Sequence, residues 1–490
     1  MNTEKKNTAL SYIGFTCCMC FFFSLFNGLD ESFVTPQSYS IAFAEQLGLL
    51  ILMMCAFALV RVANTEKRIV LLEGPVTLLF VALSFVLTLS VQFLGNEFPV
   101  LELVNSACCG LASAFLICSW FSRLGPDGLG TFAPRLFICA GAGAFFCIIF
   151  CTLPSVPLAS LFALVSGFCL MFYGMDCEYL QLAEAENTSS SAVKILSSRI
   201  RSGTVLFGVC AGLVQSYLFS VGDASDYTNL YALVFFVLFC IGASQLHSLV
   251  SGSDKPSAGA TSMQKNEKQD KAQMWRFALC YSYRIAICLF LAGLFLIPVL
   301  DSSAISGVSI AQAGYFSLLI VVSSLFVMIS YVLRVPFSMS VSEGLSMLFA
   351  GQVLGLLAAN VFIYVANQNE LGIVVIAFAG VLSIFTYSFL FTHQDFAELS
   401  AVASAEDNFE EACLSMSGNF GLSNREAEVL PLALKGRTAE RISQELVISK
   451  STVDTHLRRI YAKCGVHNRQ ELIDLGEAYA LELSTSNSIL

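Results

Sequence analysis

The chain has 490 residues, of which 56% are hydrophobic and only 13% are charged. A soluble globular chain typically carries roughly 25% charged residues, so this composition excludes a wholly soluble protein. The charge is also unevenly distributed, because nine of the 26 Lys and Arg residues lie in the last 90 positions. The net charge of −10 therefore averages over two different regions and says little about binding to nucleic acid.

Apolar runs of the length needed to cross a bilayer, about 20 residues, recur along most of the chain. Twelve such runs lie at approximately 9–28, 39–60, 70–93, 100–121, 134–153, 155–175, 202–221, 229–249, 277–298, 311–333, 344–365 and 371–391. The first run is interpreted as a span and not as a signal peptide, because no A-x-A-like cleavage site follows it. The sequence therefore predicts an all-α fold with about twelve transmembrane helices.

The charges of the loops predict the orientation of these spans. With the N-terminus in the cytoplasm, every cytoplasmic loop carries Lys or Arg, whereas the outside connections carry none. Arg61 and Lys67, for example, follow the second span on the inside, and Asp30 and Glu31 follow the first span on the outside. An even number of spans returns the C-terminus to the cytoplasm. We therefore expect a multi-pass protein of the cell membrane, surrounded by lipid, with both termini cytoplasmic.

Three polar connections interrupt the apolar pattern. Residues 176–201 divide the spans six and six, and residues 250–276, rich in Ser, Gly and Lys, are expected to form a flexible tether. Residues 393–419 contain six acidic residues and no Lys or Arg, and they are expected to form an acidic cytoplasmic linker.

The C-terminal region carries the start and stop signals of four short helices. Capping-box patterns occur at Ser423 with Glu426 and at Asn468 with Glu471. Further N-cap residues are Thr438 and Ser449, and a glycine that ends a helix is Gly465. The second and third helices are separated by the short turn at 447–448, which is the arrangement of a helix-turn-helix.

The third of these helices has an apolar face and a polar face. The apolar residues recur at helical spacing and are expected to face inward, at Val453, Leu457, Ile460 and Cys464. The opposite face presents Lys450, Asp454, Thr455, Arg458 and Arg459. From Ser449 to Lys463 there are four bases and one acid, with His456 as a further donor. That balance suits a helix that enters the negatively charged major groove of DNA.

The residue order in this region resembles the LuxR/NarL-type helix-turn-helix family. The resemblance rests on LSNREAEVL, ISKSTVDTHLRRIYAKCGV and NRQEL, and it covers about 55 residues. It implies that double-stranded DNA is the partner and that the bases are read by Asp454, Thr455 and Arg458. The DNA backbone would be positioned by Lys450, Thr452, His456 and Arg459, and a homodimer would form through the helix at 469–481.

With this resemblance the sequence predicts four regions. They are a polytopic membrane domain (1–392), an acidic linker (393–419), a four-helix LuxR-type DNA-binding domain (420–482) and a tail (483–490).

The six-plus-six arrangement of spans resembles a major-facilitator-type transporter. The resemblance is architectural, because the loop RVANTEKR at 61–68 lacks the Gly-x-x-x-Asp-Arg pattern of that family. Two Gly-x-x-x-Gly pairs, Gly208 with Gly212 and Gly351 with Gly355, favour close helix packing within one chain over dimerisation.

Polar residues inside spans are candidates for ligand binding, because burying them in lipid is costly. Arg284 is the foremost candidate, with a snorkelling or packing Arg as the alternative. Weaker candidates, each better explained by structural hydrogen bonding or by a position at an interface, are Glu45, Glu102, Asn105, Gln215, Gln352 and Asn360.

No metal-ligand spacing, phosphate-binding loop, nucleophile elbow or receiver domain is visible, so we expect no metal, no cofactor and no enzyme activity. The leading hypothesis is a bacterial, membrane-bound, one-component transcriptional regulator that senses an unknown small molecule or the membrane state. The alternatives are a transporter with a regulatory DNA-binding tail, or release of the tail by proteolysis near 393–419. The acidic segment at 393–419 either is a solvated linker or binds the basic face of the DNA-binding domain in the absence of a signal.

Overall fold

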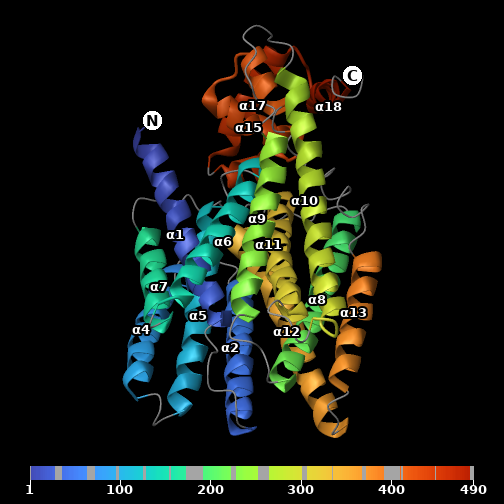
Figure 1. Cartoon of the computed structure of the whole chain (residues 1–490). Coiled ribbons are helices and arrows are strands. Elements are labelled where there is room, and N and C mark those ends of the chain that lie inside the picture. The colour runs from blue at the N-terminus through green and yellow to red at the C-terminus, as the bar shows by residue number, and fades with distance from the viewer. Residues whose placement is uncertain are drawn as a thin grey trace. The chain divides into compact units, whose positions relative to one another are not determined.

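The structure is a computed structural model, and it describes residues 2–27, 36–62, 72–94, 99–124, 129–153, 156–172, 191–221, 228–251, 264–300, 306–333, 335–366, 371–390, 409, 412–446 and 448–485. Every regular element in these ranges is helical, which confirms the all-α fold (Figure 1). The chain divides into two compact units. The first comprises Met1–Ser253 and Trp275–Ala397, and the second comprises Asp254–Met274 and Glu398–Leu490.

Long apolar helices make up the first unit. They are α1 (Asn2–Asn27), α2 (Pro36–Val62), the short π-helix η1 (Leu72–Val76), α4 (Thr77–Leu94), α5 (Pro99–Leu124), α6 (Leu129–Cys151), α7 (Val156–Phe172), α8 (Ser191–Val221), α9 (Thr228–Ser251), α10 (Gln264–Leu296), α11 (Gly307–Leu333), α12 (Phe337–Ala366) and α13 (Leu371–Leu390). A helix lies at each predicted apolar range, with η1 and α4 together covering the third. Within the described residues, eight helices have the length and apolar character that a membrane crossing requires. The count of twelve crossings stays a prediction.

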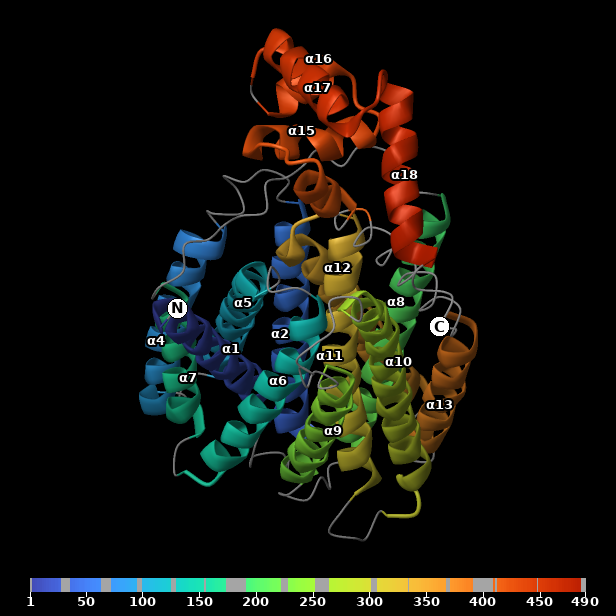
Figure 2. The same cartoon turned by 90° about the horizontal axis from the view of Figure 1, so that it is seen from above.

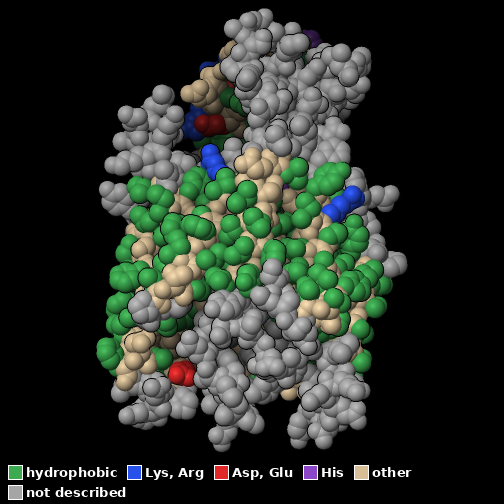
Figure 3. All heavy atoms as spheres, in the orientation of Figure 1, with side chains coloured by type: hydrophobic (Ala, Val, Ile, Leu, Met, Phe, Trp, Pro, Cys, Tyr) green, Lys and Arg blue, Asp and Glu red, His purple; other side chains and the backbone are tan. Residues whose placement is uncertain are grey.

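The surface of the first unit is as apolar as a lipid-facing surface must be. Phe93, Phe162 and Val299 are 83%, 75% and 71% exposed, and hydrophobic side chains cover most of the described surface on the face in Figure 3. Large exposed apolar areas are unfavourable in water, and here they surround a helical bundle. In contrast, nearly all residues from Gly307 to Ser330 of α11 are buried, so α11 is a central helix of the unit. The chain is a multi-pass membrane protein.

Helices α8 and α12 pack against each other through the two Gly-x-x-x-Gly pairs, and they lie side by side in Figures 1 and 2. A Cβ atom added at Gly208 or Gly212 would collide with a carbonyl oxygen of α12. A Cβ atom added at Gly351 or Gly355 would collide with a carbonyl oxygen of α8. The glycines therefore allow backbone-to-backbone contact within one chain, as the sequence favoured.

Helices α8 and α10 begin well before their apolar runs. Helix α8 begins at Ser191 and α10 at Gln264, so parts of the segments expected as a loop and a flexible tether are helical. The added first turns of α10, QKNEKQDKAQM, consist largely of residues with good helix propensity, although they are polar. A hydrophobicity window detects only the apolar part of a helix that continues beyond the bilayer.

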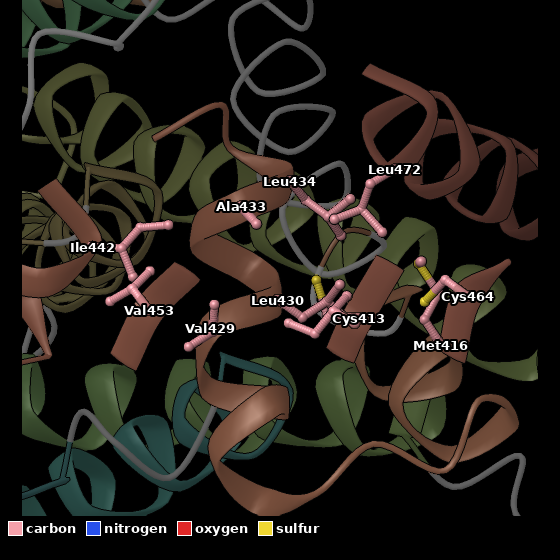
Figure 4. Packing of buried hydrophobic residues seen from close by; sticks show 11 residues of the cluster. Cys413, Met416, Val429, Leu430, Ala433, Leu434, Ile442, Val453, Cys464 and Leu472 are labelled. Carbon is pink, nitrogen blue, oxygen red and sulfur yellow. The ribbon is translucent and has the colours of Figure 1, made fainter. Parts of the chain in front are cut away.

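The second unit contains the four short helices predicted from the sequence. They are α15 (Asn424–Leu434), α16 (Ala439–Glu445), α17 (Lys450–Cys464) and α18 (Arg469–Thr485). Their inward faces form one core, whose side chains converge in Figure 4. Leu430, Ile442, Val453, Ile460 and Leu472 are fully buried there.

The core also includes residues from the segment expected to be linker. Residues 412–419 are helical, and Cys413 and Met416 are 6% and 0% exposed in the same core. Phe409 packs against it as well. The core therefore includes residues that precede position 420, because the caps of α15 mark only where that helix begins. The remaining linker positions, 393–408 and 410–411, lie outside the described residues.

Candidate nucleic-acid interface

The first helix of the second unit is fixed by a complete capping box. Ser423 Oγ accepts a hydrogen bond from the Glu426 N–H at 3.4 Å, and Glu426 Oε2 accepts one from the Ser423 N–H at 2.8 Å. Both bonds satisfy N–H groups that a helix start otherwise leaves without partners. The predicted capping box is confirmed.

The same glutamate holds the end of α17. Lys463 Nζ lies 2.7 Å from Glu426 Oε2 and donates a hydrogen bond to the Gly421 carbonyl at 2.9 Å. The hydrogen bonds from Lys463 and from the Ser423 N–H lower the pKa of Glu426 from 4.5 to about 2. Lys463, one of the four bases counted from Ser449 to Lys463, is therefore bound inside the domain.

Helices α16 and α17 are capped as predicted. Thr438 Oγ1 accepts from the Arg441 N–H at 3.3 Å, and Ser449 Oγ accepts from the Thr452 N–H at 3.1 Å. Gly465 ends α17 with a φ of +70°, a left-handed conformation that favours glycine. These caps fix where the two helices of the helix-turn-helix, α16 and α17, begin and where α17 ends.

The second predicted capping box forms with a different partner. Asn468 Oδ1 accepts from the Glu471 N–H at 2.9 Å, as expected. Glu471 Oε2, however, accepts from the N–H of His467 at 2.7 Å and not from that of Asn468. The return hydrogen bond of this capping box therefore reaches one residue further toward the N-terminus than predicted, and the start of α18 is still capped.

The inward face of α17 agrees with the predicted spacing. Val453 and Ile460 are fully buried, Cys464 is 8% exposed, and Leu457 packs partly buried against the core. Figure 4 shows Val453 pointing toward Ile442 of α16, which holds the two helices of the motif together.

The outward face of α17 carries most of the predicted DNA-contacting residues. The exposed ones are Lys450, Thr452, Thr455, Arg458 and Arg459, whereas Asp454 and His456 are half-buried. All seven therefore lie on one short helix.

Some of these side chains are already engaged within the domain. The Thr455 hydroxyl donates to the Ser451 carbonyl at 2.8 Å, and Lys450 Nζ lies 4.0 Å from Glu440 Oε2. The Nδ1 atom of His456 is buried and has no hydrogen-bond partner among the described residues. Among the described residues, the positive charges on the outward face that remain available for DNA are therefore mainly those of Arg458 and Arg459. Lys450 adds a third charge on the same face.

The predicted ligand residues of the first unit do not form one site. Arg284 is half-buried on α10, with its guanidinium 5.8 Å from the centre of the exposed Tyr281 ring. Glu45 of α2 hydrogen-bonds to Ser106 of α5 and lies near Glu102.

Of the remaining four ligand candidates, Asn105 lies on α5 and accepts a hydrogen bond from the Thr88 hydroxyl at 3.0 Å, and the other three lie on α8 and α12. Asn360 is half-buried on α12. Gln215 of α8 accepts a hydrogen bond from Gln352 at 2.6 Å, and the Tyr315 hydroxyl donates to Gln352 at 2.7 Å. The structure therefore joins Gln215 and Gln352 but separates them from Arg284 and the two glutamates.

Two polar groups in the first unit were not indicated by the sequence pattern. Tyr315 lies in an apolar run, where the sequence alone indicates an aromatic side chain that packs in the core. Glu343 of α12 lies 3.0 Å from Arg61 of α2 and 3.1 Å from Arg201 of α8, and these ion pairs join three helices. An acid at the edge of an apolar run, on the side predicted to carry the basic loops, is the signal that could have identified this cluster.

Comparison with known proteins identifies the family to which part of the second unit is similar. Residues 421–475 match the GerE family, described as bacterial regulatory proteins of the luxR family. The chain is 40% identical over 60 residues to the Fimbriae Z protein of Escherichia coli (strain K12), which is 12% of this chain and 29% of that protein. It is 41% identical over 56 residues to the HTH-type transcriptional regulator MalT of Vibrio parahaemolyticus, covering 11% and 6%. The chain thus spans less than a third of the length of these relatives.

Similar solved structures cover the rest of the chain. The human organic anion transporter MFSD10 aligns with a TM-score of 0.49 at 12% identity, covering 79% of this chain and 99% of that one. A bacterial homologue of the iron transporter ferroportin aligns with a TM-score of 0.48 at 11% identity, covering 81% and 99%. Both TM-scores are below 0.5, and no activity follows from them. Residues 421–475 are a LuxR-type helix-turn-helix DNA-binding domain, and they are carried by a chain that also contains a multi-pass helical membrane part.

Proposed function

We propose that the protein is a membrane-bound, one-component transcriptional regulator. The observation that carries this proposal is the presence of a luxR-family domain and of eight apolar membrane-length helices in one chain. The membrane part senses a small molecule or the state of the membrane, and the C-terminal domain binds promoter DNA. Coupling requires that the signal stabilise one conformation of the membrane part over another.

The DNA contacts follow from the outward face of α17. Asp454, Thr455 and Arg458 read base edges in the major groove, with Arg458 able to donate two hydrogen bonds to guanine. The DNA backbone is held by Lys450, Thr452, His456 and Arg459. Exposure of Arg458 and Arg459 supports this assignment, whereas the enclosed Nδ1 of His456 leaves that residue only its other nitrogen.

A homodimer through α18 would place two copies of α17 on an inverted-repeat site. Both termini lie in the cytoplasm in this proposal, which the distribution of Lys and Arg among the loops supports.

Chromatin immunoprecipitation of the full-length protein tests the proposal. We expect enrichment of discrete promoters, lost in Arg458→Ala, with the protein recovered intact in the membrane fraction. Promoter occupancy by a small soluble C-terminal fragment would instead indicate release by proteolysis. Absence of any enriched promoter would contradict the regulator function and would leave transport, measured as uptake into proteoliposomes, as the function to examine.

A further inference from the structure

A cavity lies within the first unit between five of its helices. Its interior has a volume of about 50 Å³, and the space widens to about 420 Å³ when the open mouth is included. The described residues that line it come from α1, α8, α10, α11 and α12 and are aliphatic, aromatic or amide side chains, among them Ala211, Gln215, Gln312, Tyr315 and Gln352.

One wall of the cavity is a fixed hydrogen-bond chain. Tyr315 donates to Gln352 at 2.7 Å, and Gln352 donates to Gln215 at 2.6 Å. Gln215 and Gln352 each lie close to a glycine of the contact between α8 and α12, where the two backbones touch. The polar wall is therefore preorganised, because the helices that carry it cannot shift independently.

One polar atom at the cavity remains unused. Gln312 lines the cavity, and its Oε1 atom is buried without a hydrogen-bond partner among the described residues. A buried acceptor without a partner costs free energy, which a ligand that donates a hydrogen bond would recover. The other walls are aromatic or aliphatic and suit an apolar body.

The charge of the lining restricts the ligand further. None of the described lining residues is Lys, Arg, Asp, Glu or His, so a charged ligand would be desolvated without an opposite charge. We propose that this cavity binds an uncharged small molecule with an apolar body and at least one hydrogen-bond donor directed at Gln312. The inference deepens the proposed function, on which it rests, by locating the sensing site.

Four compounds with one ring skeleton test this ligand class. They are 2-indanol (neutral, with a donor), indane (neutral, without a donor), 2-aminoindane (a cation) and indane-2-carboxylate (an anion). Binding to the purified full-length protein in detergent is measured as the rise in unfolding temperature with concentration, which depends on ligand concentration relative to Kd. We expect a saturable rise that is largest for 2-indanol, smaller for indane and smallest for the two charged compounds.

Two variants connect the effect to the cavity. Gln312→Leu removes the acceptor, so 2-indanol should bind about threefold to tenfold more weakly and lose its advantage over indane. Ala211→Leu fills part of the space, so both neutral compounds should bind more weakly. Gln46→Leu is the matched control, because Gln46 is also buried with an unpaired side-chain amide but does not line this cavity.

Three results would overturn the inference: no saturable rise with 2-indanol, equal stabilisation by the charged compounds, or an unchanged preference for 2-indanol in Gln312→Leu. Failure of the proposed function is recognised separately by promoter occupancy. If the ligand preference behaves as expected but no promoter is enriched, the binding site stands and the regulator function does not.

Discussion

Arg458 is the residue whose position most directly supports DNA reading. It is exposed on the outward face of α17, while Val453 and Ile460 fix the opposite face in the core. Arg458→Ala should cost about 1–3 kcal/mol of specific binding and relax the sequence preference at one base pair. Electrophoretic mobility shifts on an enriched promoter measure this loss.

Arg425→Ala provides a control for the removal of one positive charge. Arg425 is exposed on α15 and pairs with Glu428 at 2.7 Å. Its replacement should change binding little, and a loss equal to that of Arg458→Ala would show that only net charge matters.

Glu426 connects the start of α15 to the end of α17, so its charge stabilises the domain. Glu426→Gln should lower the free energy of unfolding by about 1.5–3 kcal/mol, because it weakens charged hydrogen bonds at a buried site. Glu428→Gln should change it by less than about 0.5 kcal/mol, because that pair is exposed. Urea unfolding followed by circular dichroism compares the two variants in a C-terminal fragment.

The pH dependence of this contribution has a defined sign. The pKa of Glu426 is lowered in the folded state, from 4.5 to about 2, so its stabilisation is fully present above the unfolded value. It should be lost as pH falls from about 5 toward 2. A Glu426→Gln variant should lack this part of the pH dependence, and an identical acid profile in both proteins would contradict the assignment.

At the scale of single residues, local sequence patterns predict caps but not distant partners. Ser423, Thr438, Ser449 and Gly465 act as predicted, because a cap involves residues three or four positions apart. The pairing of Lys463 with Glu426 was not predicted, because Glu426 lies on another helix. The spacing along α17 does not reveal that contact.

Among the elements, the contact between α8 and α12 depends on the absence of side chains. Gly212→Ala should lower the unfolding temperature of the detergent-purified protein, because its methyl group would strike the Gln352 carbonyl and separate the helices. Gly242→Ala on α9 is the matched control, since a Cβ atom there meets nothing within 4 Å. It should be neutral or slightly stabilising through helix propensity. Equal effects of both variants would remove the packing argument.

The helix at 412–419 is an element that sequence reasoning left out of the DNA-binding domain. A fragment of residues 409–485 should unfold at a higher urea concentration than one of residues 420–485, because the shorter fragment loses the buried Met416 and Cys413 side chains. Equal midpoints would show that this helix adds no stability. Leu414→Ala in the longer fragment is a control, since Leu414 is 74% exposed.

The sequence located most elements correctly because apolar runs and caps are local signals. Prediction of helices from the sequence failed at the polar start of α10. It also failed at Cys413 and Met416, which are apolar residues within an acidic segment. The cavity in the first unit could not be predicted either. Its lining comes from five helices, and the sequence gives no measure of their distances.

For the whole molecule, the distribution of loop charges predicts that both termini are cytoplasmic. A fluorescent protein fused after Leu490 should therefore fluoresce, and alkaline phosphatase at the same position should be inactive. Alkaline phosphatase fused after Asp301, in a predicted outside connection, should be active. Active phosphatase at Leu490 would contradict the orientation and with it the access of the domain to DNA.

The fusion of a DNA-binding domain to membrane helices changes how an operator is found. Soluble DNA-binding proteins slide and hop along DNA, and that search depends on their own diffusion. A domain continuous with a bilayer bundle moves only within the membrane surface, so the operator must reach the membrane through movement of the chromosome. Occupancy then follows the local concentration set by the linker and by the position of the gene within the nucleoid. Moving a target promoter to a distant chromosomal locus would therefore alter its regulation without any change in protein or operator sequence.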